Sequence, residues 1–220
     1  MNEKLAPTDR TRLRRNHDRG RFERETVYAI LDAMPLCHIG FVLNGAPSIL
    51  PTLQWREGDR VYWHASSAGR GIRAQEGKEV CLTVTLLDGM VLARSAFHHS
   101  ANYRSVMVFG KPVAVVDPDE KQEKMKNLIE AFYPGRWEHL RPITAQEVKA
   151  TTILSLPITE ASAKIRAGGP VDDEEDYALP IWAGVLPLRY AKGEAQPDER
   201  NLPGVEIPPE VKKFMIGEKL

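Results

Sequence analysis

The chain has 220 residues, of which 42% are hydrophobic, and this is enough for one domain with a sizeable core. Lys and Arg together number 30, as do Asp and Glu, so no net charge draws the molecule towards nucleic acid or anionic lipid. No apolar run approaches the roughly 20 residues of a membrane-spanning helix, and the charged segment 1–24 lacks the apolar stretch of a signal peptide. We therefore expect a soluble cytoplasmic protein with no membrane and no nucleic-acid partner.

The first 24 residues form a polar arm in which arginines are interleaved with acidic residues. The arginines are Arg10, Arg12, Arg14, Arg15, Arg19, Arg21 and Arg24. Because the acids dilute this charge, we interpret the arm as a solvated segment that docks on the rest of the chain. Contact with RNA phosphates is the alternative.

An amphipathic helix is predicted over 22–34, where four apolar residues recur with the i, i+3, i+4, i+7 spacing of one helix face. These residues are Val27, Ile30, Leu31 and Met34. Pro35 ends the helix, because the residue before a proline disfavours helical backbone angles.

From residue 36 to residue 116 the apolar pattern changes to that of β-strands. Asn44-Gly45 tolerates positive φ and predicts a tight hairpin turn. The expected strands cover 36–43, 48–56, 61–64, 80–87, 90–97 and 103–116. Six strands joined mostly by short turns predict a mainly β protein with flanking helices, built as an antiparallel barrel or sandwich.

Two helices and two further strands are expected after this sheet. Asp117 can cap a helix that begins at Pro118, and Thr144 with Glu147 forms a capping box for a second, short helix. The two strands cover 152–158 and 161–167. Prolines make the end of the chain extended. The expected organisation is a basic arm over 1–24, one domain over 25–190 and an extended tail over 191–220.

Two clusters of hydroxyl, glycine and guanidinium groups predict a phosphate-binding site. The first lies at 63–73, where backbone amides can approach an anion, serines can donate hydrogen bonds and an arginine can bind a phosphate bidentately. Its members are Ser66, Ser67, Gly69, Arg70, Gly71 and Arg73. The second cluster, 100–105, places Arg104 beside Tyr103 and two serines. Together they favour a phosphorylated ligand with an aromatic part, whereas each alone also matches an ordinary surface turn.

The histidines indicate no metal centre. His98 and His99 are adjacent, so in an extended chain they point to opposite faces. His38 lies in an apolar strand-like run, which favours a core or interface histidine satisfied by a backbone group. His64 stands at the entrance of the first phosphate cluster and is the histidine that we expect to touch a ligand.

The order of these motifs resembles the flavin-binding split-barrel proteins, and within them the pyridoxamine-phosphate-oxidase-related branch that includes the nitroimidazole-resistance proteins. The resemblance spans about Arg10 to Arg189. It rests on the runs Cys-His-Ile-Gly-Phe at 37–41, Tyr-Trp-His-Ala-Ser-Ser-Ala-Gly-Arg at 62–70 and Asn-Tyr-Arg-Ser-Val-Met-Val-Phe-Gly-Lys at 102–111.

The resemblance implies a six-stranded antiparallel split barrel, a homodimer and one FMN at each of two sites between the subunits. The residues that it assigns to the cofactor come from four stretches of the chain. They are Leu50, Pro51, Thr52 and Leu53; His64, Ala65, Ser66, Ser67, Gly69, Arg70 and Gly71; Ser100, Tyr103, Arg104, Ser105 and Val106; and Trp182 and Arg189 from the other subunit. Arg70 stands where many relatives have Lys, and the chain lacks the carboxy-terminal Arg-x-His that true pyridoxamine-phosphate oxidases use on their substrate.

These observations favour an FMN-dependent oxidoreductase that acts on a small substrate, such as an aromatic or nitro compound, and takes electrons from a reduced donor. The flavin would carry the redox chemistry, so no catalytic side chain is assigned. A non-catalytic flavin carrier or sensor is the alternative, and a barrel that binds RNA through its arm is a further one.

Overall fold

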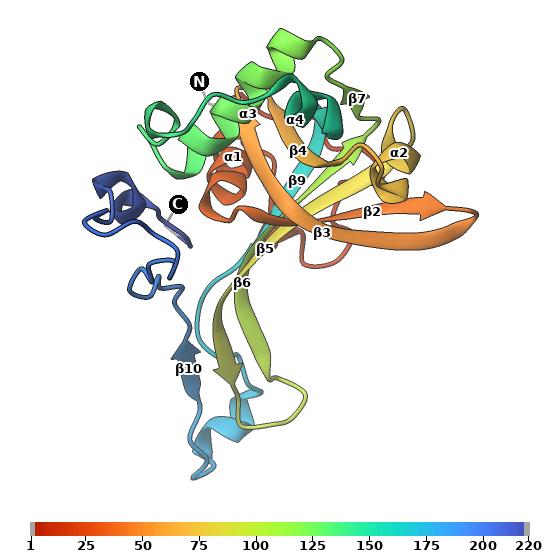
Figure 1. The fold of residues 1–220 in the computed structure, drawn as a ribbon. Coiled ribbons are helices and arrows are strands. Elements are labelled where there is room, and N and C mark those ends of the chain that lie inside the picture. Colours follow the sequence, from red (N-terminus) through yellow and green to blue (C-terminus); the bar gives the residue numbers. More distant parts are fainter. Residues whose placement is uncertain (1–2, 218–220) are drawn as a thin grey trace.

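The structure is a computed structural model and describes residues 3–217. Its strands are β1 (Gly20–Arg21), β2 (Leu36–Leu43), β3 (Ala46–Glu57), β4 (Arg60–Ser66), β5 (Val80–Leu92), β6 (Ser100–Gly110), β7 (Val113–Ala114), β8 (Thr151–Pro157), β9 (Glu160–Arg166) and β10 (Gly184–Pro187). Its helices are α1 (Arg24–Ala33), α2 (Arg70–Gln75), α3 (Pro118–Phe132) and α4 (Ala145–Ala150), with 3-10 turns η1 (His17–Arg19), η2 (Trp137–His139), η3 (Glu174–Ala178) and η4 (Pro209–Lys213). The strands curl around a central core (Figure 1).

The strand order in the sheet is β1-β9-β6-β5-β2-β3-β4-β8-β7, with β10 added beside β5. Every strand pairing among the described residues is antiparallel. The prediction of a mainly antiparallel β fold with flanking helices is therefore confirmed, although the sheet has ten strands instead of six. One expected strand is wrong: 90–97 is the end of the long strand β5 followed by a loop, because a bulge after Leu87 bends that strand without ending it.

The first hairpin follows from its turn residues. Asn44 and Gly45 both have positive φ, 51° and 80°, as the predicted turn between β2 and β3 requires. Leu43 pairs with Ala46 and Leu36 pairs with Leu53, so the two strands stay in register along their length. This register gives β2 one buried and one exposed face.

The main core lies inside the barrel and is closed by α1. Val27, Ile30 and Leu31 of α1 are fully buried and belong to the same apolar cluster as Leu82 and Val108 of the barrel strands. Two carbonyl groups at the end of α1 are hydrogen-bonded by a side chain: the buried amide of Gln54 donates to the carbonyls of Leu31 (2.6 Å) and Met34 (2.9 Å). The apolar stripe of the predicted helix is thus the face that seals the barrel.

A second apolar layer covers the outer face of β3, β4 and β8. Here Trp55, Tyr62, Val115 and Ile153 form a separate buried cluster, against which Met125, Leu128 and Phe132 of α3 pack. The predicted caps are present: Asp117 accepts from the amides of Asp119 (3.0 Å) and Glu120 (2.9 Å), and Thr144 and Glu147 form the capping box of α4. Strand β4 is therefore covered on both faces, by the barrel core and by this helical layer.

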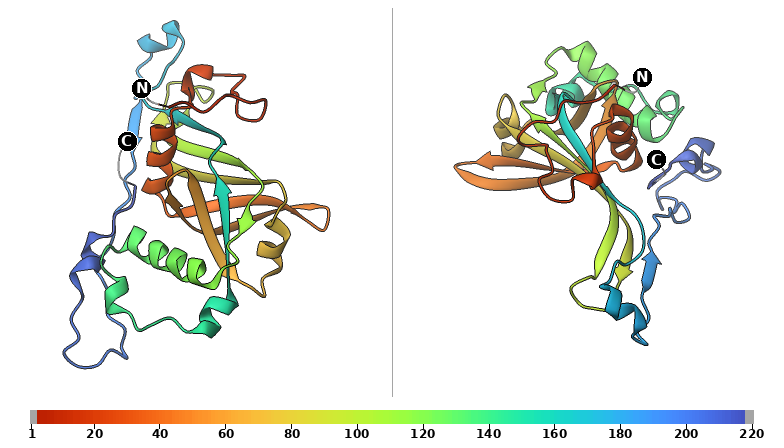
Figure 2. Two further views of the ribbon diagram at one scale, coloured as in Figure 1. Left: turned by 90° about the horizontal axis from the view of Figure 1, so that it is seen from above. Right: turned by 180° about the vertical axis from the view of Figure 1, so that it is seen from behind.

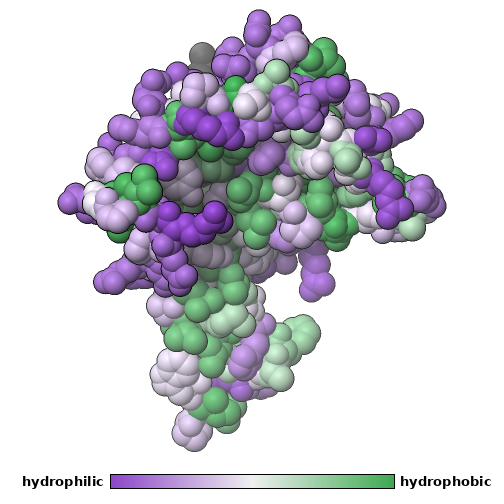
Figure 3. All heavy atoms as spheres, in the orientation of Figure 1, coloured by the Kyte–Doolittle hydropathy of each residue, from purple (hydrophilic) through white to green (hydrophobic). Residues whose placement is uncertain are grey.

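The far ends of β5 and β6 leave the barrel as a stalk, to which the returning chain adds β10 (Figures 1 and 2). At the tip, the carboxylate of Asp172 has no exposed surface and accepts from the backbone amide (2.9 Å) and the guanidinium (3.0 Å) of Arg94. Apolar residues gather along this stalk (Figure 3). Among them are Met90, Trp182 and Leu186, all exposed.

The described parts of the amino-terminal arm and the carboxy-terminal tail contact the rest of the fold. In the amino-terminal arm, β1 pairs with β9, and the guanidinium of Arg10 lies between Glu79 and Glu160. In the tail, Lys192 donates to the carbonyls of Lys212 and Phe214, and the amide of Gly217 donates to the carbonyl of Ala33 (2.7 Å). No helix in the described part of the chain is long and apolar enough to cross a membrane.

Candidate functional site

The first predicted phosphate cluster forms the turn between β4 and α2. The amide of Gly69 donates to the carbonyl of Ser66 (2.8 Å), and a Cβ at Gly69 would stand 3.0 Å from that oxygen, so this tight turn needs a glycine. The amide of Ser67 donates to the carbonyl of Ala150 (2.8 Å), and Arg73 donates to the carbonyl of Ser67 (2.7 Å). Arg70 is exposed at the start of α2. The turn therefore presents serine hydroxyls and a guanidinium on a fixed backbone.

The second cluster differs from the prediction at two positions. Arg104 directs its guanidinium at the carboxylate of Asp88, with N–O distances of 2.9 and 2.8 Å, so its charge is already neutralised within the chain. Val106 is fully buried in the barrel core and its side chain cannot line an outer pocket. Ser105 and Tyr103 do lie on the outer face of the sheet, near Lys164 of β9.

Within one chain the two clusters do not meet. The α2 side of the barrel lies beside the start of β5, where Val80 pairs with Gly110, whereas Tyr103 pairs with Leu87. Seven residues of strand separate these two points, or about 23 Å. Figure 1 shows α2 at the side of the barrel, whereas β6 extends down into the stalk, away from α2. One chain therefore does not bring both clusters into a single pocket, and the cofactor site expected between two subunits stays a prediction.

The remaining predicted residues also lie apart. On β3, Pro51 and Leu53 are exposed on the outer face of the sheet, while Leu50 packs against the core and Thr52 is half-buried. The same outer face carries His38, which is exposed and not a core residue. Trp182 (70% exposed) and Arg189 flank β10 on the stalk. Ala65 turns into the barrel core.

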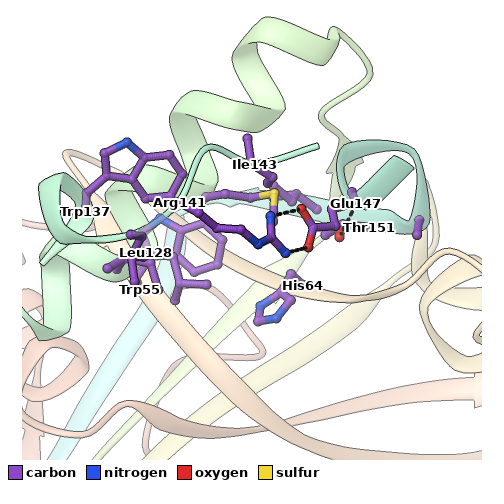
Figure 4. Close-up of a pocket in the computed structure, with 13 residues that line it drawn as sticks. Trp55, His64, Leu128, Trp137, Arg141, Ile143, Glu147 and Thr151 are labelled. Atoms are coloured by element: carbon purple, nitrogen blue, oxygen red, sulfur yellow. Dashed lines mark hydrogen bonds and ion pairs between the residues drawn. The ribbon is translucent and has the colours of Figure 1, made fainter. Parts of the chain in front are cut away.

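The structure brings together a different set of residues, around a cavity of about 590 Å³ between the outer face of β3, β4 and β8 and the helical layer of α3, η2 and α4 (Figure 4). This volume is in the range of small-molecule and cofactor sites. The lining is mostly apolar and aromatic. It comprises Trp55, His64, Met125, Leu128, Ile129, Trp137, Leu140, Arg141, Ile143, Glu147, Ala150, Thr151 and Ile153.

His64 is the one imidazole that lines this cavity. It follows Tyr62 on the outer face of β4, and its ring lies 6.4 Å from that of Trp55, tilted by 58°. Its Nδ1 is buried and has no hydrogen-bond partner among the described residues. Burial lowers the pKa of His64 below its ordinary value, because desolvation disfavours the charged ring. At neutral pH the ring is therefore the neutral imidazole, the form that ligates metals.

One ion pair stands at the edge of this cavity. Arg141 binds the carboxylate of Glu147 through both of its terminal nitrogens, with one of the N–O distances at 3.0 Å (Figure 4). Hydrogen bonds from Arg141 and Thr144 lower the pKa of Glu147 to about 2. An apolar interior with a single polar edge suits an amphipathic ligand.

The sequence-based prediction missed this cavity because the cavity depends on α3 packing over β4, a contact between residues far apart in the chain. A signal was present: the run Val61-Tyr-Trp-His-Ala65 is apolar on both strand faces, which is typical of a strand covered on both sides. Of its alternating residues, Trp63 enters the barrel and His64 enters the second layer. Among the described residues, no group of three or more His, Cys, Asp or Glu could hold a metal ion.

Residues 23–165 match the family model described as pyridoxamine 5'-phosphate oxidase. The chain belongs to this family. The resemblance inferred from the sequence motifs is thereby confirmed. No curated protein matches the chain.

The solved structures that are similar to this chain include the following three. The flavocytochrome Anf3 from Azotobacter vinelandii shares 53% identity over 97% of this chain and 100% of that one, with a TM-score of 0.94. An FAD- and heme-binding protein from Mycobacterium smegmatis shares 34% identity over 90% and 97%, with a TM-score of 0.85. A putative 5-nitroimidazole resistance protein from Bacteroides thetaiotaomicron shares 21% identity over 64% and 83%, with a TM-score of 0.51, and shows the common fold.

Proposed function

We propose that this chain is an oxidoreductase that binds a flavin at the turn after β4 and a heme in the cavity lined by His64. The observation that carries the proposal is the apolar cavity with an unpartnered, neutral imidazole in its wall. The names of two similar structures support it, since one is a flavocytochrome and the other an FAD- and heme-binding protein.

The residues present fit a heme. A heme needs an apolar pocket and, in globins and peroxidases, one histidine as proximal ligand. The aromatic rings of Trp55 and Trp137 and the apolar side chains of α3 supply that pocket, and His64 supplies the ligand. A buried Nδ1 without a partner among the described residues lowers the stability of the folded chain. A residue that serves ligand binding can carry such a cost.

The turn 66–71 fits the phosphate end of a flavin cofactor. Ser66 and Ser67 offer hydroxyl donors, and Arg70 offers an exposed guanidinium. FAD is favoured over the FMN expected from the family resemblance, because the relative with 34% identity is named as an FAD-binding protein. The role of Arg104 as a phosphate ligand is not retained, since Asp88 occupies its guanidinium.

The two proposed sites adjoin along one strand. His64 and Ser66 are two residues apart on the same face of β4, which corresponds to about 7 Å along a strand. When bound, a flavin could accept an electron pair from a donor and release it one electron at a time, which is how a heme would take electrons up. The chain's role is to hold both groups close together and to exclude water from the heme side with α3 and η2. Passage of electrons between them to a small acceptor, including dioxygen, is the activity that this arrangement supports.

A homodimer is part of the proposal. The outer face of β2, β3, β5 and β6 carries exposed apolar side chains that a single chain leaves uncovered. They are Leu36, Val42, Ile49, Leu53, Leu87 and Met107. A second copy on this face would also bring the stalk residue Trp182 of one chain towards the β3 residues of the other, as the family resemblance implies.

Chemical extraction of the purified protein tests the proposal. We expect the absorption bands of both flavin and heme, with FAD identified in the extract by chromatography against FMN and riboflavin standards. Reduction by a nicotinamide donor, followed by reoxidation in air, would support an oxidoreductase, whereas tight binding of both groups without turnover would support a carrier. A protein that binds neither added flavin nor added heme would refute the proposal.

A further inference from the structure

Arg141 is the one guanidinium that lines the cavity in the described part of the chain. It lies in the segment between η2 and α4, beside Glu147, in a lining that is mostly apolar (Figure 4). Its side chain is 67% exposed, while that of its partner Glu147 is 41% exposed. A solvent-exposed ion pair of this kind adds little stability, because water screens both charges.

Glu147 does not depend on Arg141 for its hydrogen bonds. Its carboxylate also accepts from the backbone amide (2.8 Å) and the hydroxyl (3.0 Å) of Thr144, as part of the capping box that begins α4. If Arg141 turned away, Glu147 would keep these two donors and its place on the helix. The chain therefore loses little free energy when Arg141 leaves Glu147 for another carboxylate.

We propose that Arg141 exchanges the carboxylate of Glu147 for a carboxylate of the ligand, so that the cavity selects a flat apolar macrocycle with acidic groups at one edge. This inference rests on the proposed heme site and adds to it the group that recognises the heme propionates. Glu147 acts as an internal competitor that occupies Arg141 when the cavity holds no acid. The apolar lining binds the ring, and Arg141 sets its orientation with the acidic edge at the mouth.

Comparing each porphyrin with its dimethyl ester separates the contribution of the ligand's carboxylates to binding from that of its apolar ring. Binding of heme and of heme dimethyl ester would be measured by quenching of the fluorescence of Trp55 and Trp137, which line the cavity. Metal-free protoporphyrin IX and its dimethyl ester repeat the comparison without the iron that His64 would ligate. The wild-type chain should prefer the free acid of each pair.

Two variants of this ion pair should change that preference in opposite directions. Arg141→Leu should weaken binding of the free acids about tenfold, in the range of a charge-assisted hydrogen bond partly offset by the release of Glu147. Glu147→Gln, which keeps an N3 acceptor for the cap but removes the competing charge, should strengthen it several-fold. Binding of the esters should stay within about twofold in both variants. Lys149→Leu, on the exposed surface of the same short helix, is the matched control and should change neither.

The outcomes distinguish this inference from the proposed function. If the wild-type chain binds heme but Arg141→Leu weakens acid and ester equally, or weakens neither, the role of Arg141 is refuted while the heme site stands. If the wild-type chain binds none of the four porphyrins, both fail. Circular dichroism of each variant shows whether α4 and the rest of the fold are retained.

Discussion

Arg104 and Asp88 face each other on neighbouring strands β6 and β5, joined by two hydrogen bonds of 2.9 and 2.8 Å, and the arginine side chain is only 12% exposed. The pair lies beside the bulge at which β5 enters the stalk. A guanidinium with this partner holds two strands together, and its pKa is raised by the hydrogen bond to Asp88. We therefore expect Arg104 to have a structural role, which the following variants test.

Arg104→Ala should lower the free energy of unfolding by about 2 kcal/mol, because it leaves a half-buried carboxylate without its partner. Asp88→Ala should act in the same direction, and the double variant should be no less stable than Arg104→Ala alone, since both changes remove one shared interaction. Urea unfolding of the four proteins measures this. Additive effects, or a loss of flavin affinity at unchanged stability, would restore the phosphate-binding role predicted from the sequence.

His64→Leu should stabilise the cofactor-free protein by about 1 kcal/mol while abolishing heme binding. The substitution removes a buried nitrogen that has no hydrogen-bond partner among the described residues and replaces it with an apolar group in an apolar cavity. Thermal unfolding of the apoproteins is the measurement. Tyr62→Leu, which removes the ring stacked on Trp55 at 5.5 Å, is the control and should destabilise the same layer. If His64→Leu instead destabilises the apoprotein, the imidazole contributes to the stability of the fold and the prediction is contradicted.

Acid should remove a small part of the protein's stability through Glu147, because water screens the charges of its exposed ion pair. Its pKa of about 2 in the folded chain lies below the ordinary value of 4.5, so its contribution to stability is complete above pH 4.5 and is lost as the pH falls towards 2. Glu147→Gln should therefore make the free energy of unfolding depend less steeply on pH within that window. Urea unfolding at several pH values between 5 and 2.5 measures the slope. Glu175→Gln, at an exposed position in η3, should leave the slope unchanged, and equal slopes for all three proteins would contradict the assignment.

Ile49→Lys should produce a monomer. Ile49 is 71% exposed in the middle of the apolar outer face, where a charge would have to be buried on association. Light scattering should show half the mass of the wild-type particle, and flavin affinity should fall with it if the second copy completes the site. Val116→Lys, at another exposed apolar position just before α3 and outside that face, should leave the mass unchanged. A wild-type chain that is itself monomeric would exclude the proposed dimer.

The sequence predicted those parts of the fold that depend on local chemistry. Asn44-Gly45, Asp117-Pro118 and the Thr144–Glu147 box act over a few residues, and each forms the turn or cap expected of it. Motif order was enough to recognise the family. Strand ends were less predictable, because the bulge at Asp88 depends on pairing with β6 and not on the residues of β5 alone.

The candidate site was harder to predict because it depends on contacts distant in sequence. Nothing local in the sequence indicates that Arg104 pairs with Asp88, which lies 16 residues earlier and on the neighbouring strand. Likewise, His64 and Met125 share a cavity only because α3 packs over the outer face of β4. The sequence predicted that a helix begins at Pro118, but not which surface this helix would cover, nor that a space would remain between the two.

The most direct test of the account is the absorption spectrum of the protein reconstituted with heme, compared between the wild type and His64→Ala. If His64 ligates the iron, the wild type should show the Soret band of a histidine-bound heme. The variant should lose or shift that band, and added imidazole should restore it by filling the space left by the side chain. Identical spectra for the two proteins, with or without imidazole, would contradict the central claim that this cavity holds heme through His64.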